Sequence, residues 1–256
     1  MQVDLSGRRA IVTGAASGIG RAIAEGLAAS GARVLLADLS DEGKTVAAGL
    51  PGCAFERADV ASRDDCRRAV DRAVELFGGV DILVNDAGLQ HVAPVEEFPE
   101  DRWEHLVRVM LIGAFLLTKY ALPHMYRAGW GRIVNISSIH GLVASPYKSA
   151  YIAAKHGLIG LTKTVALEAG GKGVTVNAIC PAYVRTPLVE KQIAAQAREH
   201  GIPESEVVGR IMLEPAAIKR LLEPEEVAAY TLFLCSDDAA GITGTAQVID
   251  GGWTAR

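Results

Sequence analysis

The residue types that could do chemistry in this sequence centre on a tyrosine and a lysine four positions apart. Tyr151 and Lys155 begin a run of helical period, Tyr151–Ala169, so both side chains lie on one face of a helix, one turn apart. An ammonium about 4 Å from a phenol, at an effective dielectric constant of about 20, favours the phenolate by about 4 kcal/mol, or roughly three pKa units, before desolvation opposes it. Such a pair could take a proton from an alcohol, although the same spacing also occurs in plain amphipathic surface pairs.

A glycine-rich turn follows the first apolar run of the chain. The string from Thr13 to Gly20 is TGAASGIG, and it leads into a segment of helical period. Glycines there let backbone amides and a helix N-terminus approach a pyrophosphate that a Cβ would keep away, although an ordinary tight turn can have the same residues. The pattern is typical of a dinucleotide site.

Asp38 ends the second apolar run, 18 residues after Gly20. This is close to the spacing of a carboxylate that accepts hydrogen bonds from an adenosine ribose. A carboxylate at that point repels a 2′-phosphate, and no arginine or lysine lies between positions 14 and 20, so NAD is favoured over NADP. The alternative is that Asp38 is a helix N-cap, and both roles predict the same exposed position.

The order of the apolar runs predicts the scaffold that holds these residues. Short apolar runs alternate with longer segments of helical period, which is typical of parallel strands joined by crossover helices. Almost continuously apolar strands are buried on both faces, so we expect an α/β fold with a doubly wound parallel, Rossmann-like sheet in three layers, forming one NAD-binding domain over residues 1–256. The expected strands are Ala10–Val12, Arg33–Ala37, Ala54–Arg57, Asp81–Val84, Ile133–Ile136, Val174–Ile179 and Ala246–Ile249.

One stretch interrupts this alternation. Residues 186–222 are helix-like and charged and contain Pro203 and Pro215, so we expect a helical insertion that closes over the site as a substrate lid. The last strand is followed by Asp250-Gly251-Gly252, which leaves Trp253 on a short tail.

Composition limits the classes of function. The chain has 256 residues, half of them hydrophobic, so it can bury a large core without disulfides. Its four cysteines have neither CxxC nor zinc-finger spacing, so we expect no metal site and a reducing compartment. A net charge of −4 without a basic cluster argues against nucleic acid. The polar first residues, and a longest apolar run, Val109–Leu117, well short of the roughly 20 residues of a membrane span, predict a cytoplasmic protein without a membrane partner.

These motifs resemble the short-chain dehydrogenase/reductase family over nearly the full length of the chain. The resemblance rests on the glycine turn, on Asp59-Val60 and the string Asn85-Asp86-Ala87-Gly88 after two strands, and on Ser138 with the YxxxK pair. It implies hydride transfer in which Tyr151 is the acid/base, Ser138 positions the reacting oxygen and Lys155 contacts the nicotinamide ribose. The NAD-binding residues it implies are Gly14, Ser17, Gly18, Ile19, Gly20, Asp38, Asp59, Val60, Asn85, Ala87, Gly88, Tyr151, Lys155, Pro181, Val184 and Thr186.

The sequence departs from this family at three positions. Asp86 replaces an asparagine, and an ionised aspartate can only accept hydrogen bonds. Met110 replaces an asparagine that holds a water in a proton relay to the lysine, and we expect backbone carbonyls near Leu89 or Gln90 to hold that water instead. Ala182 replaces a glycine, with a minor adjustment of its loop expected.

Four further strings resemble the members of this family that act on D-3-hydroxybutyrate and acetoacetate. They are Gln90–Pro94, Ile139–Ser145, Thr186–Ile193 and Asp250–Trp253. The resemblance implies that the substrate carboxylate is bound by Gln90, His140, Lys148 and Gln192, beside Ser138 and Tyr151, and that Trp253 closes the pocket.

The spacing of the residues also favours a small anionic substrate. Lys148 precedes Tyr151 by three residues and His140 follows Ser138 by two, so both can converge beside the reacting carbon. The alternative for Lys148 is a solvated charge on the surface, and the alternative for His140 is a loop histidine whose hydrogen bonds are made within the protein. Two alternatives concern the function of the whole protein. It could act on another small hydroxy acid or alcohol, or it could be a catalytically silent NAD-binding protein.

The family resemblance also implies a homotetramer. The Val109–Leu117 run is unusually apolar for a helix that flanks a sheet. Such a face needs cover, which either a second copy of the chain or the monomer's own sheet could provide.

Overall fold

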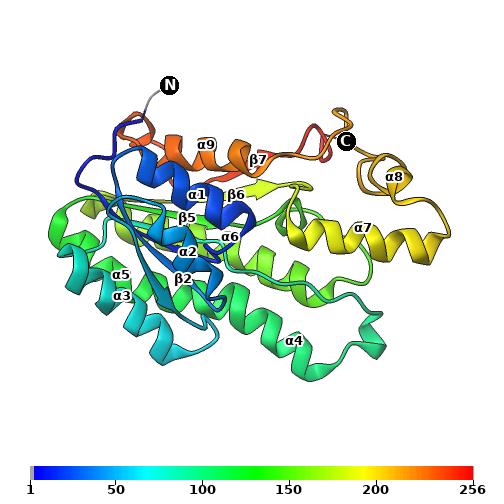
Figure 1. Ribbon diagram of the computed structural model, residues 1–256, viewed down its shortest axis with the longest axis horizontal. Helices are drawn as coiled ribbons and strands as arrows, with labels where there is room; N and C mark the ends of the chain where they lie inside the picture. The colour runs from blue at the N-terminus through cyan, green and yellow to red at the C-terminus, as the bar shows by residue number, and fades with distance from the viewer. Residues whose placement is uncertain (1–2, 256) are drawn as a thin grey trace.

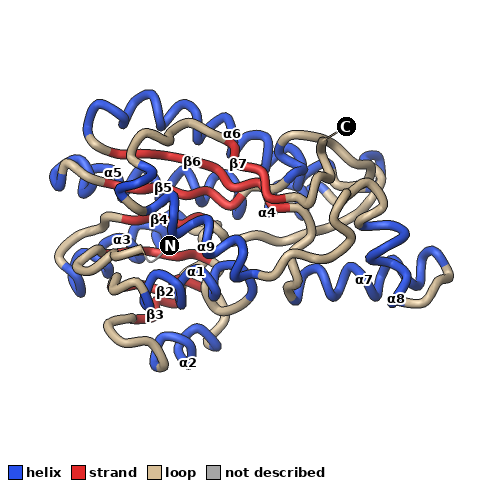
Figure 2. Tube along the Cα trace, turned by 90° about the horizontal axis from the view of Figure 1, so that it is seen from above, coloured by secondary structure: helices blue, strands red, loops and turns tan. Residues whose placement is uncertain are grey.

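Seven parallel strands form a single sheet in the order β3-β2-β1-β4-β5-β6-β7, and Figure 2 shows them lying side by side. The computed structural model describes residues 3–255, so Met1 and Gln2, the first two residues of the polar N-terminal stretch, and Arg256 lie outside the described residues. The strands are β1 (Arg9–Thr13), β2 (Arg33–Asp38), β3 (Ala54–Arg57), β4 (Ile82–Asn85), β5 (Gly131–Ile136), β6 (Val174–Pro181) and β7 (Ala246–Ile249).

Helices cover both faces of the sheet and make the molecule three-layered (Figure 1). One face is covered by α3, α5 and α6, and the other by α1, α2 and α9. The helices are α1 (Gly18–Ala29), α2 (Glu42–Ala48), α3 (Arg63–Phe77), α4 (Glu100–Val107), α5 (Gly113–Ala128), α6 (Ser149–Ala169), α7 (Pro187–His200), α8 (Glu204–Val207) and α9 (Pro224–Cys235).

Alternation along the strands explains why both faces are buried. In β1, Ile11 packs into the core under α3 and α5, while Ala10 and Val12 pack into the core under α1 and α9. All four residues of β4 are buried. Because full burial of a large aliphatic side chain contributes about 1.5–3 kcal/mol, the two cores together hold the sheet between its helices.

The predicted fold class is confirmed. All seven predicted strands are present, two with the predicted bounds and the others with ends that differ by one or two residues. The largest differences are that β5 begins at Gly131 and β6 runs on to Pro181, because Gly131 pairs with Val174 in β6 and Pro181 pairs with Ile249 in β7. Sequence hydropathy does not report such pairing.

The carboxyl ends of β1 and β4 meet where the direction of strand addition reverses. Ligands of open α/β sheets bind in the crevice at such a point. Thr13, the last residue of β1, joins the two strand ends, because its hydroxyl donates to the carbonyl of Val84 at 3.4 Å and accepts the backbone N–H groups of Asp86 and Ala87 at 3.1 and 3.2 Å. The glycine turn and the Asn85–Gly88 string are thereby held next to each other.

The helical segment Glu100–Ala128 is longer than its apolar run suggested. It joins α4, a π-helical turn at Arg108–Ile112 and α5 without a break. By length and composition it could cross a membrane, but half of its apolar window is buried inside the protein. The length of the Val109–Leu117 run therefore underestimates the length of this helix. The buried half of its apolar window packs into the core under the sheet.

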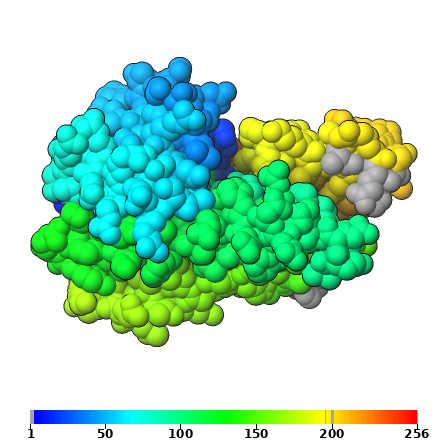
Figure 3. Space-filling model, turned by 90° about the horizontal axis from the view of Figure 1, so that it is seen from below, coloured from blue at the N-terminus to red at the C-terminus, as the bar shows by residue number. Residues whose placement is uncertain are grey.

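Residues 186–222 stand out at one end of the molecule, where α7 and α8 form the yellow-to-orange lobe of Figure 3. Within this stretch of the described chain, helical segments run from Pro187 to Met212, and no helix follows until α9. Pro215 lacks the backbone N–H that a continuing helix would need. The side chain of Lys219 donates to the carbonyls of Leu213 and Glu214, at 2.9 and 2.7 Å. The lobe has a small core of its own: Val189, Ile193, Ala197, Val207, Met212, Leu213, Ala216 and Leu221.

Candidate active site

The glycine turn between β1 and α1 has a backbone conformation that favours glycine. Gly14 and Gly18 have φ angles of +67° and +53°. A Cβ on Gly20 would clash with the carbonyl oxygen of Gly14 and would lie 2.7 Å from Oδ2 of Asp86. The turn therefore presents the N-terminus of α1 to the crevice without side chains in between, which is the arrangement that binds phosphate groups.

Asp38 lies at the end of β2 beside this turn. Its Oδ2 accepts the backbone N–H of Ala16 at 2.9 Å, and its Oδ1 accepts that of Ser40 at 2.8 Å. The alternative role as a helix N-cap is wrong, because α2 begins at Glu42 with Asp41 in the cap position. Asp38 is half-buried rather than exposed, since the glycine turn packs against it.

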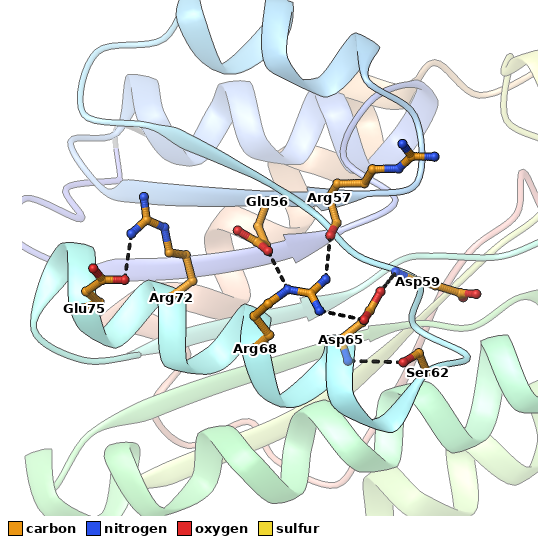
Figure 4. A network of polar contacts seen from close by, with 8 residues as sticks. All are labelled: Glu56, Arg57, Asp59, Ser62, Asp65, Arg68, Arg72 and Glu75. Carbon is orange, nitrogen blue, oxygen red and sulfur yellow. Dashed lines mark hydrogen bonds and ion pairs between the residues drawn. The ribbon is translucent and has the colours of Figure 1, made fainter.

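Asp59 follows β3 and is held at the crevice by a polar network (Figure 4). Arg68 on α3 donates to Glu56 and to the backbone carbonyl of Arg57, at 2.8 and 3.0 Å, and to Asp65 at 2.8 Å. The other oxygen of Asp65 accepts the backbone N–H of Asp59 at 2.9 Å. An arginine on the helix thus fixes the loop that carries Asp59.

These segments enclose a cleft of about 360 Å³ along the carboxyl edge of the sheet. Of the sixteen residues predicted to bind the dinucleotide, fourteen line it: Gly14, Ser17, Gly18, Ile19, Asp38, Asp59, Val60, Ala87, Gly88, Tyr151, Lys155, Pro181, Val184 and Thr186. Gly20 and Asn85 lie behind the wall. The Nδ2 of Asn85 donates to Asn135 Oδ1 at 2.8 Å, so Asn85 joins β4 to β5, as expected for a residue that supports the sheet.

Sequence reasoning missed several residues of the cleft. Leu39, 55% exposed next to Asp38, and His105 on α4 both line it. Leu188 and Val189 at the start of α7 do so as well, because Thr186 packs against Gly18. The hydrophobic residue that follows Asp38 could have been noticed, but nothing in the sequence marks His105.

Ser138, Tyr151 and Lys155 meet in the middle of this cleft. Ser138 follows β5, and its hydroxyl accepts the backbone N–H of His140 at 3.1 Å. Tyr151 lies in the first turn of α6, where its phenol makes a hydrogen bond with the Ser138 side chain. Lys155 is 4% exposed and donates from Nζ to the carbonyl of Ile136 at 2.6 Å. The predicted trio is thus assembled from the end of β5 and the start of α6.

Desolvation opposes the predicted effect of Lys155 on the acidity of Tyr151. Burial and the nearby Asp86 carboxyl raise the pKa of the phenol, while the hydrogen bond with Ser138 lowers it, and the result is a pKa of about 12. The lysine does not offset this, because its Nζ lies 5.6 Å from the centre of the tyrosine ring and burial lowers the pKa of Lys155 itself to about 8. Desolvation outweighs the attraction between the two side chains.

A second, smaller cavity of about 70 Å³ opens next to Tyr151. Its walls contain all four residues expected to bind a carboxylate, together with Ser138 and residues of α7: Gln90, His140, Lys148, Gln192, Leu188 and Val189. Its polar groups therefore converge from four separate segments of the chain. Tyr183, which the sequence did not single out, also lines the cavity, and Lys148 Nζ lies 5.8 Å from the centre of its ring.

Burial governs the charges in this cavity. It lowers the pKa of His140 to about 4, so the imidazole is neutral at physiological pH, and Nε2 makes a hydrogen bond of 2.8 Å with Ser145 Oγ. Burial also lowers the pKa of Lys148. Oε1 of Gln90 is buried without a hydrogen-bond partner in the described part of the chain. A half-buried lysine ammonium in a cavity lined by polar side chains makes this site suited to a small anion.

Trp253 borders this cavity without lining it. Its ring centre lies 6.1 Å from that of His140, and Nε1 donates to the carbonyl of Met212 at 3.1 Å. The tail is therefore packed against the lobe of α7 and α8.

The other departures from the family lie at the same edge of the sheet. Met110 is 2% exposed and lines a small internal cavity with Lys155 and Asn85, whose Oδ1 has no hydrogen-bond partner within residues 3–255. Ala182 lines both the cleft and the smaller cavity, with its N–H donating to Ile249 at 2.9 Å. In the described residues, no group of three histidine, cysteine or acidic side chains could hold a metal.

Comparison with known proteins agrees with this geometry. A family model described as enoyl-(acyl carrier protein) reductase matches residues 14–254. The chain belongs to the short-chain dehydrogenase/reductase family and is an oxidoreductase.

Two relatives carry the printed name D-beta-hydroxybutyrate dehydrogenase. The one from Rhizobium meliloti is 48% identical over 256 residues, covering 97% of this chain and 99% of the relative. The one from Cupriavidus necator is 43% identical over 262 residues, covering 98% and 100%. A 3-oxoacyl-[acyl-carrier-protein] reductase from Thermotoga maritima is 38% identical over 253 residues, covering 97% and 98%.

Proposed function

We propose that this protein is an NAD-dependent dehydrogenase that interconverts D-3-hydroxybutyrate and acetoacetate. The observation that carries the proposal is the small polar cavity beside Tyr151, in which Lys148, His140, Gln90 and Gln192 converge. The names of the Rhizobium and Cupriavidus relatives support the same substrate. The Thermotoga relative represents the alternative, a different hydroxyacyl substrate.

The larger cleft fits a dinucleotide. The glycine turn and the N-terminus of α1 line it with backbone groups. Asp38, with both oxygens already accepting backbone N–H groups, would still repel a 2′-phosphate, so NAD is the proposed cofactor. When bound, its nicotinamide would accept the hydride from the substrate carbon.

The chain's own residues would do the rest of the chemistry. Lys148 would pair with the substrate carboxylate, and the fixed position of Tyr151 relative to it would select the carbon that is oxidised. Ser138 would hold the reacting oxygen, and Tyr151 would take its proton. Because burial makes the Tyr151 phenol hard to ionise, the positive charge of the oxidised cofactor would help to favour the phenolate in the complex.

The proposal extends to the lid, the cellular location and the partners of the protein. We expect residues 186–222 to act as a lid, the protein to be cytoplasmic and homotetrameric, and neither nucleic acid nor membrane to be a partner.

Formation of NADH with each enantiomer of 3-hydroxybutyrate tests the proposal. We expect activity with the D enantiomer and NAD, at least tenfold less with the L enantiomer or with NADP, and a loss of roughly 10³-fold or more in kcat for Tyr151→Phe, since general acid/base groups contribute about 10²–10⁴-fold. Activity with neutral secondary alcohols but not with 3-hydroxybutyrate would contradict the proposed substrate and indicate a dehydrogenase of neutral alcohols. NADH binding without turnover of any hydroxy acid would make the chain a silent NAD-binding protein.

A further inference from the structure

The carboxyl group of Asp86 lies beneath the glycine turn. An added Cβ would lie 2.7 Å from its Oδ2 at Gly20 and 3.3 Å at Gly14. The carboxyl accepts the backbone N–H of Gly20, which is one of the unpaired donors of the first turn of α1. Ser17, the N-cap residue of α1, makes no capping hydrogen bond, and the first turn contains no acidic residue. Asp86 is thus an acidic group next to the N-terminus of this helix.

This position creates a conflict of charge. The N-terminus of a helix attracts anions, and this one faces the cleft proposed to bind a dinucleotide pyrophosphate. An ionised carboxylate within the same turn would repel that group. A protonated carboxyl would not, and its hydroxyl could donate a hydrogen bond.

We propose that Asp86 must carry a proton for the glycine turn to bind the dinucleotide tightly, so that cofactor binding is coupled to the uptake of a proton. This inference rests on the proposed function, because it concerns the same cleft. Protonation removes the repulsion between carboxylate and pyrophosphate, and the bound anion in turn favours the protonated form. Asp86 would therefore be a positioning and affinity-determining residue rather than one that touches the reacting atoms.

The groups around Asp86 favour a proton near neutral pH. Burial and the negative charge of Asp38 raise the pKa of the Asp86 carboxyl, while Lys155 and the Gly20 amide lower it, and the result is a pKa of about 7. Lys155 also titrates near this range, since burial lowers its pKa to about 8, and Tyr151 interacts with the same carboxylate. Loss of the lysine charge at high pH would also weaken anion binding, so the test must separate the two groups.

A titration of NADH fluorescence at pH values from 6 to 9 tests the proposal. For the unaltered protein we expect the Kd to rise roughly tenfold over this range, as repulsion by one ionised group develops. Asp86→Asn keeps the shape and the acceptor for the Gly20 N–H, and its Kd should rise about threefold or less, the remainder coming from Lys155. Asp64→Asn removes the same charge from an exposed position on α3 and should behave like the unaltered protein.

Calorimetry of NADH binding at pH 7.5, in buffers of different ionisation enthalpy, gives an independent measurement. The unaltered protein should take up a substantial fraction of a proton per bound NADH, and Asp86→Asn clearly less. A Kd that does not depend on pH, equal slopes for the protein and its Asp86→Asn variant, or binding without proton uptake would each overturn the inference. Failure of the unaltered protein to bind NADH at any pH would overturn the proposed function instead.

Discussion

Tyr151 and Lys155 show how burial can change the chemistry that a residue pattern predicts. Their spacing of four places both on one face of α6, as the sequence indicates. The lysine ammonium nevertheless donates to the Ile136 carbonyl, and burial raises the pKa of the phenol while it lowers that of the lysine. Spacing therefore predicts which side chains meet, whereas their acidity depends on desolvation by the rest of the cleft.

Lys148 carries the specificity of the proposed site. Lys148→Met keeps much of the aliphatic length but removes the charge that would pair with the substrate carboxylate. Because charge-assisted hydrogen bonds contribute about 1.5–3 kcal/mol, we expect KM for D-3-hydroxybutyrate to rise roughly 10- to 100-fold, with a smaller effect on kcat. Steady-state kinetics with this substrate and with a neutral secondary alcohol measure the loss of preference.

Lys163→Met is the matched control for Lys148→Met. Lys163 is an exposed lysine on the same helix, outside the cavity, so its replacement should leave both constants unchanged. Unaltered kinetics of Lys148→Met would remove this lysine from the site.

The elements of the sheet were easier to predict than the elements of the lobe. A strand such as β4 is buried on both faces, so its apolar run marks it in the sequence. Residues 213–222 lack both periodicity and regular structure, and they are held by contacts that come from elsewhere in the chain. Gly251, for example, accepts the backbone N–H groups of Ala217 and Ile218 at 2.9 and 2.8 Å. Sequence patterns do not record such contacts between distant segments.

Trp253 links the C-terminal tail to this lobe, and its removal should loosen the lobe. Trp253→Ala deletes the hydrogen bond to the Met212 carbonyl and a large apolar contact with the lobe's core. We expect KM for the substrate to rise about tenfold and cleavage by a protease within residues 187–222 to become several-fold faster, since local opening exposes backbone. Limited proteolysis followed by mass spectrometry locates the cuts.

Trp253→Phe separates the two contributions of this side chain. It keeps an aromatic ring but not the N–H donor, so its effects should be intermediate. If Trp253→Ala were cleaved at the same rate and the same places as the unaltered protein, the tail would not hold the lobe.

At the scale of the whole molecule, the helical segment that joins α4 and α5 leaves large apolar side chains exposed in the monomer. Ile112 and Phe115 are 36% and 44% exposed, and Trp103 on α4 is 36% exposed, although the other side of the same helical segment packs into the core. The monomer's sheet therefore covers only part of the apolar face noted in the sequence. The expected homotetramer would cover the remainder.

Phe115→Glu tests this use of the surface. A charge at the centre of an apolar contact between copies is costly to desolvate, so we expect the tetramer to give way to dimers or monomers, as measured by size-exclusion chromatography with light scattering. Lys44→Glu, a charge change on the distant helix α2, should leave the assembly intact. A monomeric unaltered protein, or a Phe115→Glu variant that remains tetrameric, would show that this face is not an interface. Since substitution at an exposed position has little effect on the core, the variant should keep its fold, which circular dichroism can verify.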